Sequence, residues 1–262
     1  MAVVWITGAS SGIGEALAKQ YVLQGDKLVL SARREAELER VKQACITRGA
    51  KADDILVLPL DLLKPDDMPN KVQTVLKYFK SIDVLINNAG ISQRSKCLDT
   101  QLSVYKKLLD VDVFGQIALT KAVLPIMVKQ GSGHIAVTSS IAGKVGVKWR
   151  TGYCAAKHAV MGFFDALRAE VKEYGIQVST IIPGFIKTDV SKNAVTGDGS
   201  GFGIEDDDIK AGMDVNKCAQ VIVKNMNKGK KEIAVGEGLP MVALWLKRLA
   251  PSLLFKMMAS KP

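Results

Sequence analysis

Residues 3–17, which read VVWITGASSGIGEAL, decide how the fold is interpreted. The apolar run Val3–Thr7 predicts a buried strand, and Gly8, Gly12 and Gly14 separate this strand from the start of a helix. Glycine lets the backbone turn sharply and approach a phosphate closely, while a helix N-terminus offers free N–H groups and a positive dipole end. The order of strand, glycine loop and helix therefore favours a phosphate-binding loop over an ordinary glycine-rich turn.

The same alternation of strand and helix continues along the chain. Each expected strand is a nearly continuous apolar run, as in sheets that helices cover on both faces. We expect one α/β domain over residues 1–262, a Rossmann-type doubly wound parallel sheet of about seven strands. The expected strands are Val3–Thr7, Lys27–Ala32, Asp54–Leu62, Ile82–Gly90, Gly133–Ser140, Gly175–Gly184 and Lys231–Gly236. The expected helices are 11–25, 34–49, 65–81, a long helix through 107–125, about 152–174, and 215–227.

Composition excludes several classes of protein. A hydrophobic content of 48% is enough for a sizeable core and argues against disorder. No apolar run approaches the roughly 18 residues of a membrane span, and no basic segment precedes the first apolar run as in a signal peptide. We expect a cytoplasmic protein. Neither a disulfide framework nor a metal site is expected, because the cysteines are scattered and include no Cys-x-x-Cys pair: Cys45, Cys97, Cys154 and Cys218.

Positive charge gathers at the C-terminal end. The net charge is +10, and residues 217–262 hold nine basic and two acidic residues, a balance of 9 − 2 = +7. Such asymmetry favours an anionic partner, and a membrane surface is the candidate. A solvated basic face is the alternative. We expect no nucleic-acid partner, because no aromatic-interleaved basic patch or nucleic-acid motif appears.

Residues Arg33 and Arg34 predict which nucleotide the loop binds. A site for NAD would carry an acidic residue about twenty residues after the glycines, to bind the ribose 2′-hydroxyl. This chain has LSARRE at that point, with two arginines and no acid at the strand end. Two guanidinium groups suit a 2′-phosphate, so NADP is favoured over NAD. Solvated arginines at a helix start are the alternative.

A tyrosine, a lysine and a serine form the candidate catalytic set. Tyr153 and Lys157 are four residues apart, and Ser140 lies thirteen residues before the tyrosine. At helical spacing the tyrosine and lysine share one face. An ammonium roughly 4 Å away stabilises a phenolate by up to ~4 kcal/mol at an effective dielectric near 20, which makes tyrosine a usable general acid/base.

Together these motifs resemble the short-chain dehydrogenase/reductase family over nearly the whole chain. The residues that carry the resemblance are the segment Thr7–Gly14 (TGASSGIG), Asn87–Gly90 (NNAG), Ser140, Tyr153, Lys157, Pro183, Gly184 and Thr188. Within the family, KLVLSARREAELERVKQ, ISQRS and NAVTGDGS look most like dehydrogenase/reductase members 7 and 7B. Those members are NADP-linked carbonyl reductases or alcohol dehydrogenases, often attached to membranes. Their N-terminal anchor is not expected here.

The resemblance implies a role for each site residue. Tyr153 would donate a proton to the substrate carbonyl, and Ser140 would hydrogen-bond that oxygen. Lys157 would bind the nicotinamide ribose and stabilise the tyrosine phenolate. Asp61 and Leu62 would border the adenine. The expected cofactor contacts are Gly8, Ser10, Ser11, Gly12, Ile13, Gly14, Arg33, Arg34, Asp61, Leu62, Asn88, Ala89, Gly90, Tyr153, Lys157, Pro183, Gly184, Ile186 and Thr188.

The resemblance also implies partners and a substrate class. We expect a small apolar carbonyl or alcohol as substrate, such as a steroid, retinoid, acyl or aromatic compound, and a homodimer or homotetramer. Residues 184–214 contain a glycine-rich and acidic stretch, which is typical of a substrate lid. Residues 239–262 form an apolar and basic extension, which we expect to border the substrate entrance and to touch anionic membranes peripherally. Packing within the subunit or at an oligomer interface is the alternative.

Two aspartates in the long helix have different expected environments. Asp110 lies one turn from Lys106 and is expected to be solvated. Asp112 falls on the inward stripe with Leu108 and Leu119. It also stands where the family places an active-site asparagine, so we treat it as a fourth catalytic candidate, ionised and separated from the lysine by a water.

The replaced asparagine leaves a second function open. An NADP(H)-binding sensor or scaffold with little turnover is the alternative to an oxidoreductase. A nucleotide-sugar epimerase would share the tyrosine and lysine motif. It usually needs a larger C-terminal domain than the roughly 75 residues that follow IIPG here.

Overall fold

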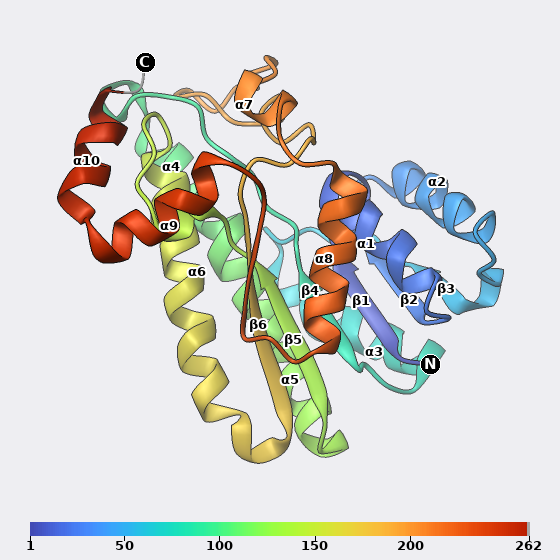
Figure 1. Ribbon diagram of the computed structural model, residues 1–262. Helices are drawn as coiled ribbons and strands as arrows, with labels where there is room; N and C mark the ends of the chain where they lie inside the picture. Colours follow the sequence, from blue (N-terminus) through green and yellow to red (C-terminus); the bar gives the residue numbers. More distant parts are fainter. Residues whose placement is uncertain (261–262) are drawn as a thin grey trace.

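A computed structural model describes residues 1–260 of the chain (Figure 1). Its seven named strands form one parallel sheet in the order β3-β2-β1-β4-β5-β6-β7. This confirms the predicted doubly wound α/β fold. The strands are β1 Val3–Thr7, β2 Lys27–Ser31, β3 Ile55–Val57, β4 Val84–Asn87, β5 Gly133–Thr138, β6 Ile176–Pro183 and β7 Glu232–Val235.

The strand order places a crevice beside β1. The chain runs outward from β1 through β2 to β3, then returns to form β4 on the other side of β1. The loops that leave the carboxyl ends of β1 and β4 therefore diverge, and ligands of open α/β sheets bind at such a switch point. The glycine loop follows β1, and Asn88 to Gly90 follow β4, so both predicted segments lie at this crevice.

Helices cover both faces of the sheet, and two apolar cores result. On one face the core holds buried residues of α1 Gly12–Val22, α2 Glu35–Ile46 and α8 Val215–Asn227. The other core holds residues of α3 Met68–Phe79, α5 Gly115–Gln130 and α6 Thr151–Glu170. Side chains that alternate along β1 enter opposite cores, which is why every residue of that strand is buried.

The helix that contains Asp112 is not continuous, contrary to the expectation of one long regular helix. It consists of α4 Leu102–Leu109, a π-helical turn over Asp110–Phe114, and α5. Such turns occur often at functional sites. As expected, Asp110 is exposed, whereas Asp112 is fully buried.

The segment 102–130 is also the one helical stretch of residues 1–260 that is long and apolar enough to cross a membrane. Its mean hydropathy is 1.6. Leu119, Val123 and Met127 of this segment pack into the core against the sheet. The length and composition of this segment therefore fit a buried core helix as well as a membrane span.

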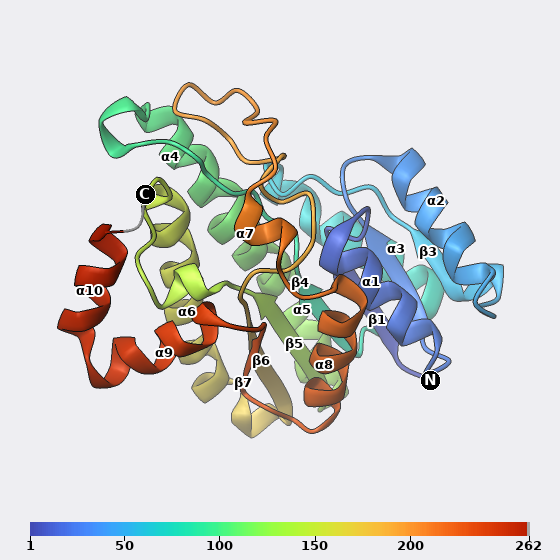
Figure 2. The same cartoon turned by 45° about the horizontal axis from the view of Figure 1, so that its top comes forward.

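Two further segments lie over the carboxyl ends of the strands. Residues 184–214 carry the short helix α7 Asp207–Lys210 and pass beside α4 (Figure 2). Within them, Val195 forms a parallel bridge with Gln93. The chain then ends with α9 Leu239–Leu249 and α10 Pro251–Ser260, which lie beside α6 in Figure 1. Residues 261 and 262 of the expected extension lie outside the described residues.

Candidate active site

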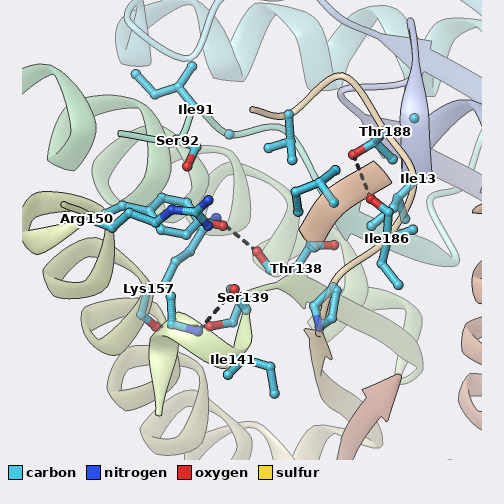
Figure 3. A pocket seen from close by; sticks show the side chains of 18 of the residues that line it. Ile13, Ile91, Ser92, Thr138, Ser139, Ile141, Arg150, Lys157, Ile186 and Thr188 are labelled. Atoms are coloured by element: carbon cyan, nitrogen blue, oxygen red, sulfur yellow. Dashed lines mark hydrogen bonds between the residues drawn. The ribbon is translucent and has the colours of Figure 1, made fainter. Parts of the chain in front are cut away.

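One cavity of about 900 Å³ opens at the carboxyl ends of the strands. It brings together nearly all of the residues that the sequence singled out, and Figure 3 shows part of its wall. Gly14 and Asp112 do not line it. Gly14 packs against the Gly8 carbonyl, and Asp112 is fully buried beside Lys157. The predicted residues that line the cavity are Gly8, Ser10, Ser11, Gly12, Ile13, Arg33, Arg34, Asp61, Leu62, Asn88, Ala89, Gly90, Ser140, Tyr153, Lys157, Pro183, Gly184, Ile186 and Thr188.

The glycine loop has the shape that a pyrophosphate needs. Gly8 and Gly12 have φ of 66° and 56°, in the left-handed region that favours glycine. A Cβ on Gly8 would lie 2.8 Å from the Ala89 Cα, and one on Gly14 would overlap the Gly8 carbonyl. No side chain caps the N-terminus of α1 at Ser11. The first N–H groups of α1 thus have no side-chain cap, and Ser11, Gly12 and Ile13 line the cavity, so the residues present fit a dinucleotide phosphate.

A threonine at the end of β1 holds the adjacent wall of the cavity. The Thr7 hydroxyl accepts hydrogen bonds from the backbone N–H groups of Asn88 and Ala89, each at 3.0 Å. The Asn88 side chain donates to the Thr7 carbonyl at 3.2 Å and accepts from the Thr138 hydroxyl at 3.1 Å. These bonds join the ends of β1, β4 and β5, so the NNAG segment is fixed against the glycine loop.

The outer end of the cavity is basic. Arg33 and Arg34 are both exposed, and the Arg34 guanidinium lies 3.4 Å from the Ser10 hydroxyl. Arg40, which the sequence did not single out, donates to the Ser10 carbonyl at 3.2 Å and binds the Glu15 carboxylate at 2.7 Å. The loop that would receive phosphates is thus bordered by guanidinium groups from α2 and the turn before it.

Lys157 is buried at the centre of the site. Its Nζ lies 3.1 Å from the Thr138 carbonyl oxygen, 3.1 Å from Asp112 Oδ2 and 5.6 Å from the Tyr153 ring centroid. Figure 3 shows Lys157 beside Thr138 and Ser139. The direct contact with Asp112 corrects the expectation of an intervening water, because the π-helical turn brings the carboxylate up to the ammonium. Gly90 leaves room for this pair: a Cβ there would lie 3.2 Å from both groups.

The two charges of this buried pair shift each other's protonation. Burial disfavours the ammonium form of Lys157, but the adjacent Asp112 and Tyr153 outweigh it, so the pKa of Lys157 is raised. Burial also raises the pKa of Asp112. Lys157 lowers this pKa, and so does the Ile91 N–H, which donates to Asp112 Oδ1 at 2.8 Å. These two effects oppose burial only in part. The pair therefore keeps the lysine protonated.

Two serines follow β5 and have different tasks. The Ser140 hydroxyl accepts from the Ala142 N–H at 3.1 Å and caps the short turn Ile141–Gly143. The Ser140 hydroxyl can still donate its own proton in a hydrogen bond to a group in the cavity. The Ser139 hydroxyl donates to the Lys157 carbonyl at 3.1 Å, which ties α6 to the end of β5. A substrate oxygen in the cavity would therefore meet Ser140 and Tyr153, with the lysine behind them.

Comparison with known proteins agrees with this geometry. The family model described as short chain dehydrogenase matches residues 2–199. The chain is 41% identical over 263 residues to dehydrogenase/reductase SDR family member 7B of Bos taurus, covering 99% of this chain and 81% of the bovine protein. This protein belongs to the short-chain dehydrogenase/reductase family. It is also 43% identical over 252 residues to family member 7 of Homo sapiens, covering 95% and 74% of the two chains.

Solved structures share the fold of this chain. One from Burkholderia phymatum, in complex with NAD, has a TM-score of 0.85 at 22% identity and covers 100% of this chain and 97% of its own. An alcohol dehydrogenase from Thermococcus sibiricus, complexed with 5-hydroxy-NADP, has a TM-score of 0.75 at 23% identity and covers 90% and 96%.

Several residues that line or support the cavity were not predicted from the sequence. Arg94 stacks over the Trp149 ring at 4.7 Å and pairs with Asp206 at 3.2 Å, and Arg150 pairs with the same carboxylate at 3.1 Å. These contacts hold residues 184–214 against the loops before α4 and α6. Trp149 has φ of 63°, which is unusual outside glycine. No local pattern marks such residues, because their partners are between 55 and 112 positions away.

Proposed function

We propose that this protein is an NADP-dependent oxidoreductase that interconverts an apolar carbonyl compound and its secondary alcohol. One observation carries the proposal: Tyr153, Ser140 and Lys157 line a single cavity whose one end is a glycine loop with two arginines and whose other end is apolar. The first end suits a phosphorylated nucleotide. The other end is built by Val145, Leu239, Val242, Leu246, Leu254 and Met257.

The proposed reduction divides the work among three side chains. Ser140 donates a hydrogen bond to the carbonyl oxygen and so polarises it. Tyr153 transfers its phenolic proton to that oxygen as a general acid. Lys157, protonated and 5.6 Å from the ring centroid, stabilises the phenolate that remains. NADPH, when bound, supplies the hydride.

The preference for NADP follows from charge at the end of β2. Arg33 and Arg34 line the cavity there, and the nearest acidic side chain along the chain, Glu35, is the first residue of α2. A 2′-phosphate carries the negative charge that two guanidinium groups bind well. Asp61 and Leu62 line the same part of the cavity and would border the adenine.

Asp112 is proposed as a positioning residue for Lys157. Its carboxylate is fully buried, fixed by the Ile91 N–H and 3.1 Å from the ammonium. The same contact favours the second candidate function, a sensor or scaffold that binds NADP(H) with little turnover. The carboxylate offsets the lysine charge, so the ammonium stabilises the Tyr153 phenolate less than it would alone.

We further propose that residues 184–214 act as a lid and that the active form is a homodimer or homotetramer. The lid residues Ile186, Val190, Asn193 and Val195 line the cavity, which supports a role in enclosing substrate. Phe114 at the join of α4 and α5 is 59% exposed, and a large exposed aromatic ring on a core helix suits a subunit interface.

The proposal is tested by following NADPH oxidation over steroids, retinals, 3-oxoacyl compounds, quinones and aromatic aldehydes. We expect turnover of at least one apolar carbonyl class, and faster turnover with NADPH than with NADH. NADPH binding with no turnover across the whole panel would favour the sensor. Absence of binding to either cofactor would overturn both candidate functions.

A further inference from the structure

The helices α9 and α10 present an apolar face to solvent beside the cavity. On α9, Leu239, Val242, Trp245 and Leu249 are 59%, 50%, 68% and 75% exposed. Their spacing of three, three and four residues puts them on one side of the helix. On α10, Leu253 and Met257 are exposed and one turn apart. A folded protein rarely leaves so many large apolar side chains together on its surface unless something covers them.

The opposite side of these helices is anchored to the rest of the protein. Leu254 is buried in a cluster with Ile141 and Met161, against which Leu244 and Leu246 also pack. Lys247 lies 4.7 Å over the Phe255 ring and holds α9 against α10. The exposed face is therefore the outer side of two packed helices rather than an unpacked tail.

Charge identifies what the surface fits. Residues 239–260 contain Lys247, Arg248 and Lys256 and no acidic residue. Exposed leucines and a tryptophan on helices whose charged residues are all cations are typical of a segment that lies in the plane of an anionic lipid interface. A tryptophan ring sits well at the headgroup level, and each cation near such a surface adds attraction.

We infer that α9 and α10 form a docking surface for an anionic membrane. The same two helices line the apolar end of the cavity through Leu246, Leu254 and Met258, and Leu239, Val242 and Met257 of the exposed face lie at the rim of that end. Docking would place the mouth of that end at the lipid surface. An apolar substrate could then enter from the bilayer, a consequence that rests on the proposed function, whereas docking itself does not.

Flotation of the full chain with lipid vesicles tests the inference. We expect binding at low salt to vesicles of equimolar phosphatidylcholine and phosphatidylserine, release by high salt, and none to phosphatidylcholine alone. Trp245→Ala should weaken binding about tenfold and Arg248→Ala about fivefold. The matched control is Leu23→Ala, which removes a 62% exposed leucine elsewhere on the surface and should change nothing.

Three results would overturn the docking surface. The first is absence of flotation with the anionic vesicles at low salt. The second is that Leu23→Ala and Trp245→Ala weaken vesicle binding equally. The third is that the protein binds no vesicles and forms a dimer that Trp245→Ala dissociates. The last result would assign the face to a second copy of the chain. NADPH affinity of each variant shows that it is folded, and flotation needs no substrate, so failure here is distinct from failure of the proposed reaction.

A second inference rests on a different observation, the buried amide of Gln93. Its Oε1 accepts the backbone N–H groups of Gly152 at 2.7 Å and Tyr153 at 3.2 Å, and its Nε2 donates to the Ser95 hydroxyl at 3.1 Å. Two of the free donors at the start of α6 are thereby bound by one side chain. The Gln93 backbone pairs with Val195 of the lid segment.

We infer that Gln93 is a positioning residue that holds Tyr153 in register and links it to the seating of the lid. This inference rests on the proposed function of Tyr153. Gln93→Met keeps the side-chain volume but removes the acceptor. Gln93→Glu keeps an acceptor at the positive end of α6.

Kinetics on the reductase and amide hydrogen exchange test this role together. We expect Gln93→Met to lower kcat about tenfold with unchanged NADPH affinity, and Gln93→Glu to restore most of it. The Tyr153 amide should exchange faster in Gln93→Met only. Wild-type kcat in Gln93→Met, or unchanged exchange of the Tyr153 amide, would contradict the role. The exchange experiment needs no turnover, so it separates this failure from that of the proposed reaction.

Discussion

The ion pair between Asp112 and Lys157 is the residue-scale feature that distinguishes this site. A buried carboxylate is costly unless it is paired, and Asp112 is paired with the lysine and with the Ile91 N–H. Without the negative charge, the pKa of Lys157 would fall, since burial alone lowers it. The asparagine usual in the family would leave the ammonium charge uncompensated beside Tyr153.

Asp112→Asn should therefore preserve or raise turnover. Tyr153 also raises the pKa of Lys157, so the lysine stays protonated when the carboxylate is gone. The ammonium then stabilises the Tyr153 phenolate more strongly, and the pH profile of alcohol oxidation should shift toward lower pH. The measurement is kcat/KM against pH for both proteins. A loss of more than tenfold in the asparagine variant would mean that the carboxylate has a role of its own.

Arg33 gives a second residue-scale prediction, on cofactor choice. Arg33→Ala should weaken NADPH binding by roughly 1–3 kcal/mol, the scale of a charge-assisted hydrogen bond, and leave NADH almost unchanged. Calorimetric titration with both nucleotides measures this. Arg48→Ala, which removes an exposed arginine near the far end of α2, is the control. Equal losses for NADPH and NADH would refute a 2′-phosphate site.

At the scale of elements, the packing of α5 fixes the wall of the cofactor site. Gly115 begins α5, and a Cβ there would lie 2.6 Å from both the Cβ and the carbonyl oxygen of Leu62. Leu62 lines the cavity, so α5 sets the position of that wall through a contact that only glycine allows.

Gly115→Ala should lower the free energy of unfolding by roughly 1–3 kcal/mol, because the new methyl group overpacks the contact with Leu62. Urea denaturation measures the change. Gly162→Ala on α6 is the matched control, since a Cβ there meets nothing within 4 Å and alanine favours a helix by about 0.5–1 kcal/mol. Equal effects of the two substitutions would show that the contact with Leu62 is not tight.

His134 links β5 to β6 and, through Ser179, to the turn before β7, and its burial makes the stability of the fold depend on pH. Its Nε2 lies 2.8 Å from the Ser179 hydroxyl, which itself donates to the Lys230 carbonyl at 2.6 Å before β7. Burial lowers the pKa of His134 to about 4 from 6.5. The folded state disfavours the charged ring. The contribution of His134 to the unfolding free energy is therefore complete above pH 6.5 and is lost as the pH falls toward 4.

The His134→Gln variant should lack this pH dependence. Between pH 7 and pH 4 the wild-type protein should lose up to about 3 kcal/mol more unfolding free energy than the variant. Urea denaturation at both pH values gives the difference, and acid effects of other groups cancel because both proteins share them. Parallel pH curves for the two proteins would show that the ring titrates as if exposed.

At the scale of the whole molecule, local patterns predicted the fold and most of the cavity. Each strand was an apolar run bounded by a turn, and the glycine loop follows β1 as expected. The strand order then places this loop and the segments that follow β4 and β5 at the carboxyl edge of the sheet. The π-helical turn and the direct contact of Asp112 with Lys157 were missed, because both depend on how α4 and α5 settle against α6. Contacts of Gln93, Arg94 and Asp206 were missed because distant loops create them.

The central claim is that Tyr153 is the proton donor of an NADP-dependent carbonyl reduction. The most direct test compares wild type and Tyr153→Phe for NADPH affinity and for kcat on the best substrate of the carbonyl panel. We predict unchanged NADPH affinity and loss of most turnover, because only the phenolic proton is removed. A Tyr153→Phe variant that reduces the substrate at the wild-type rate would contradict the mechanism.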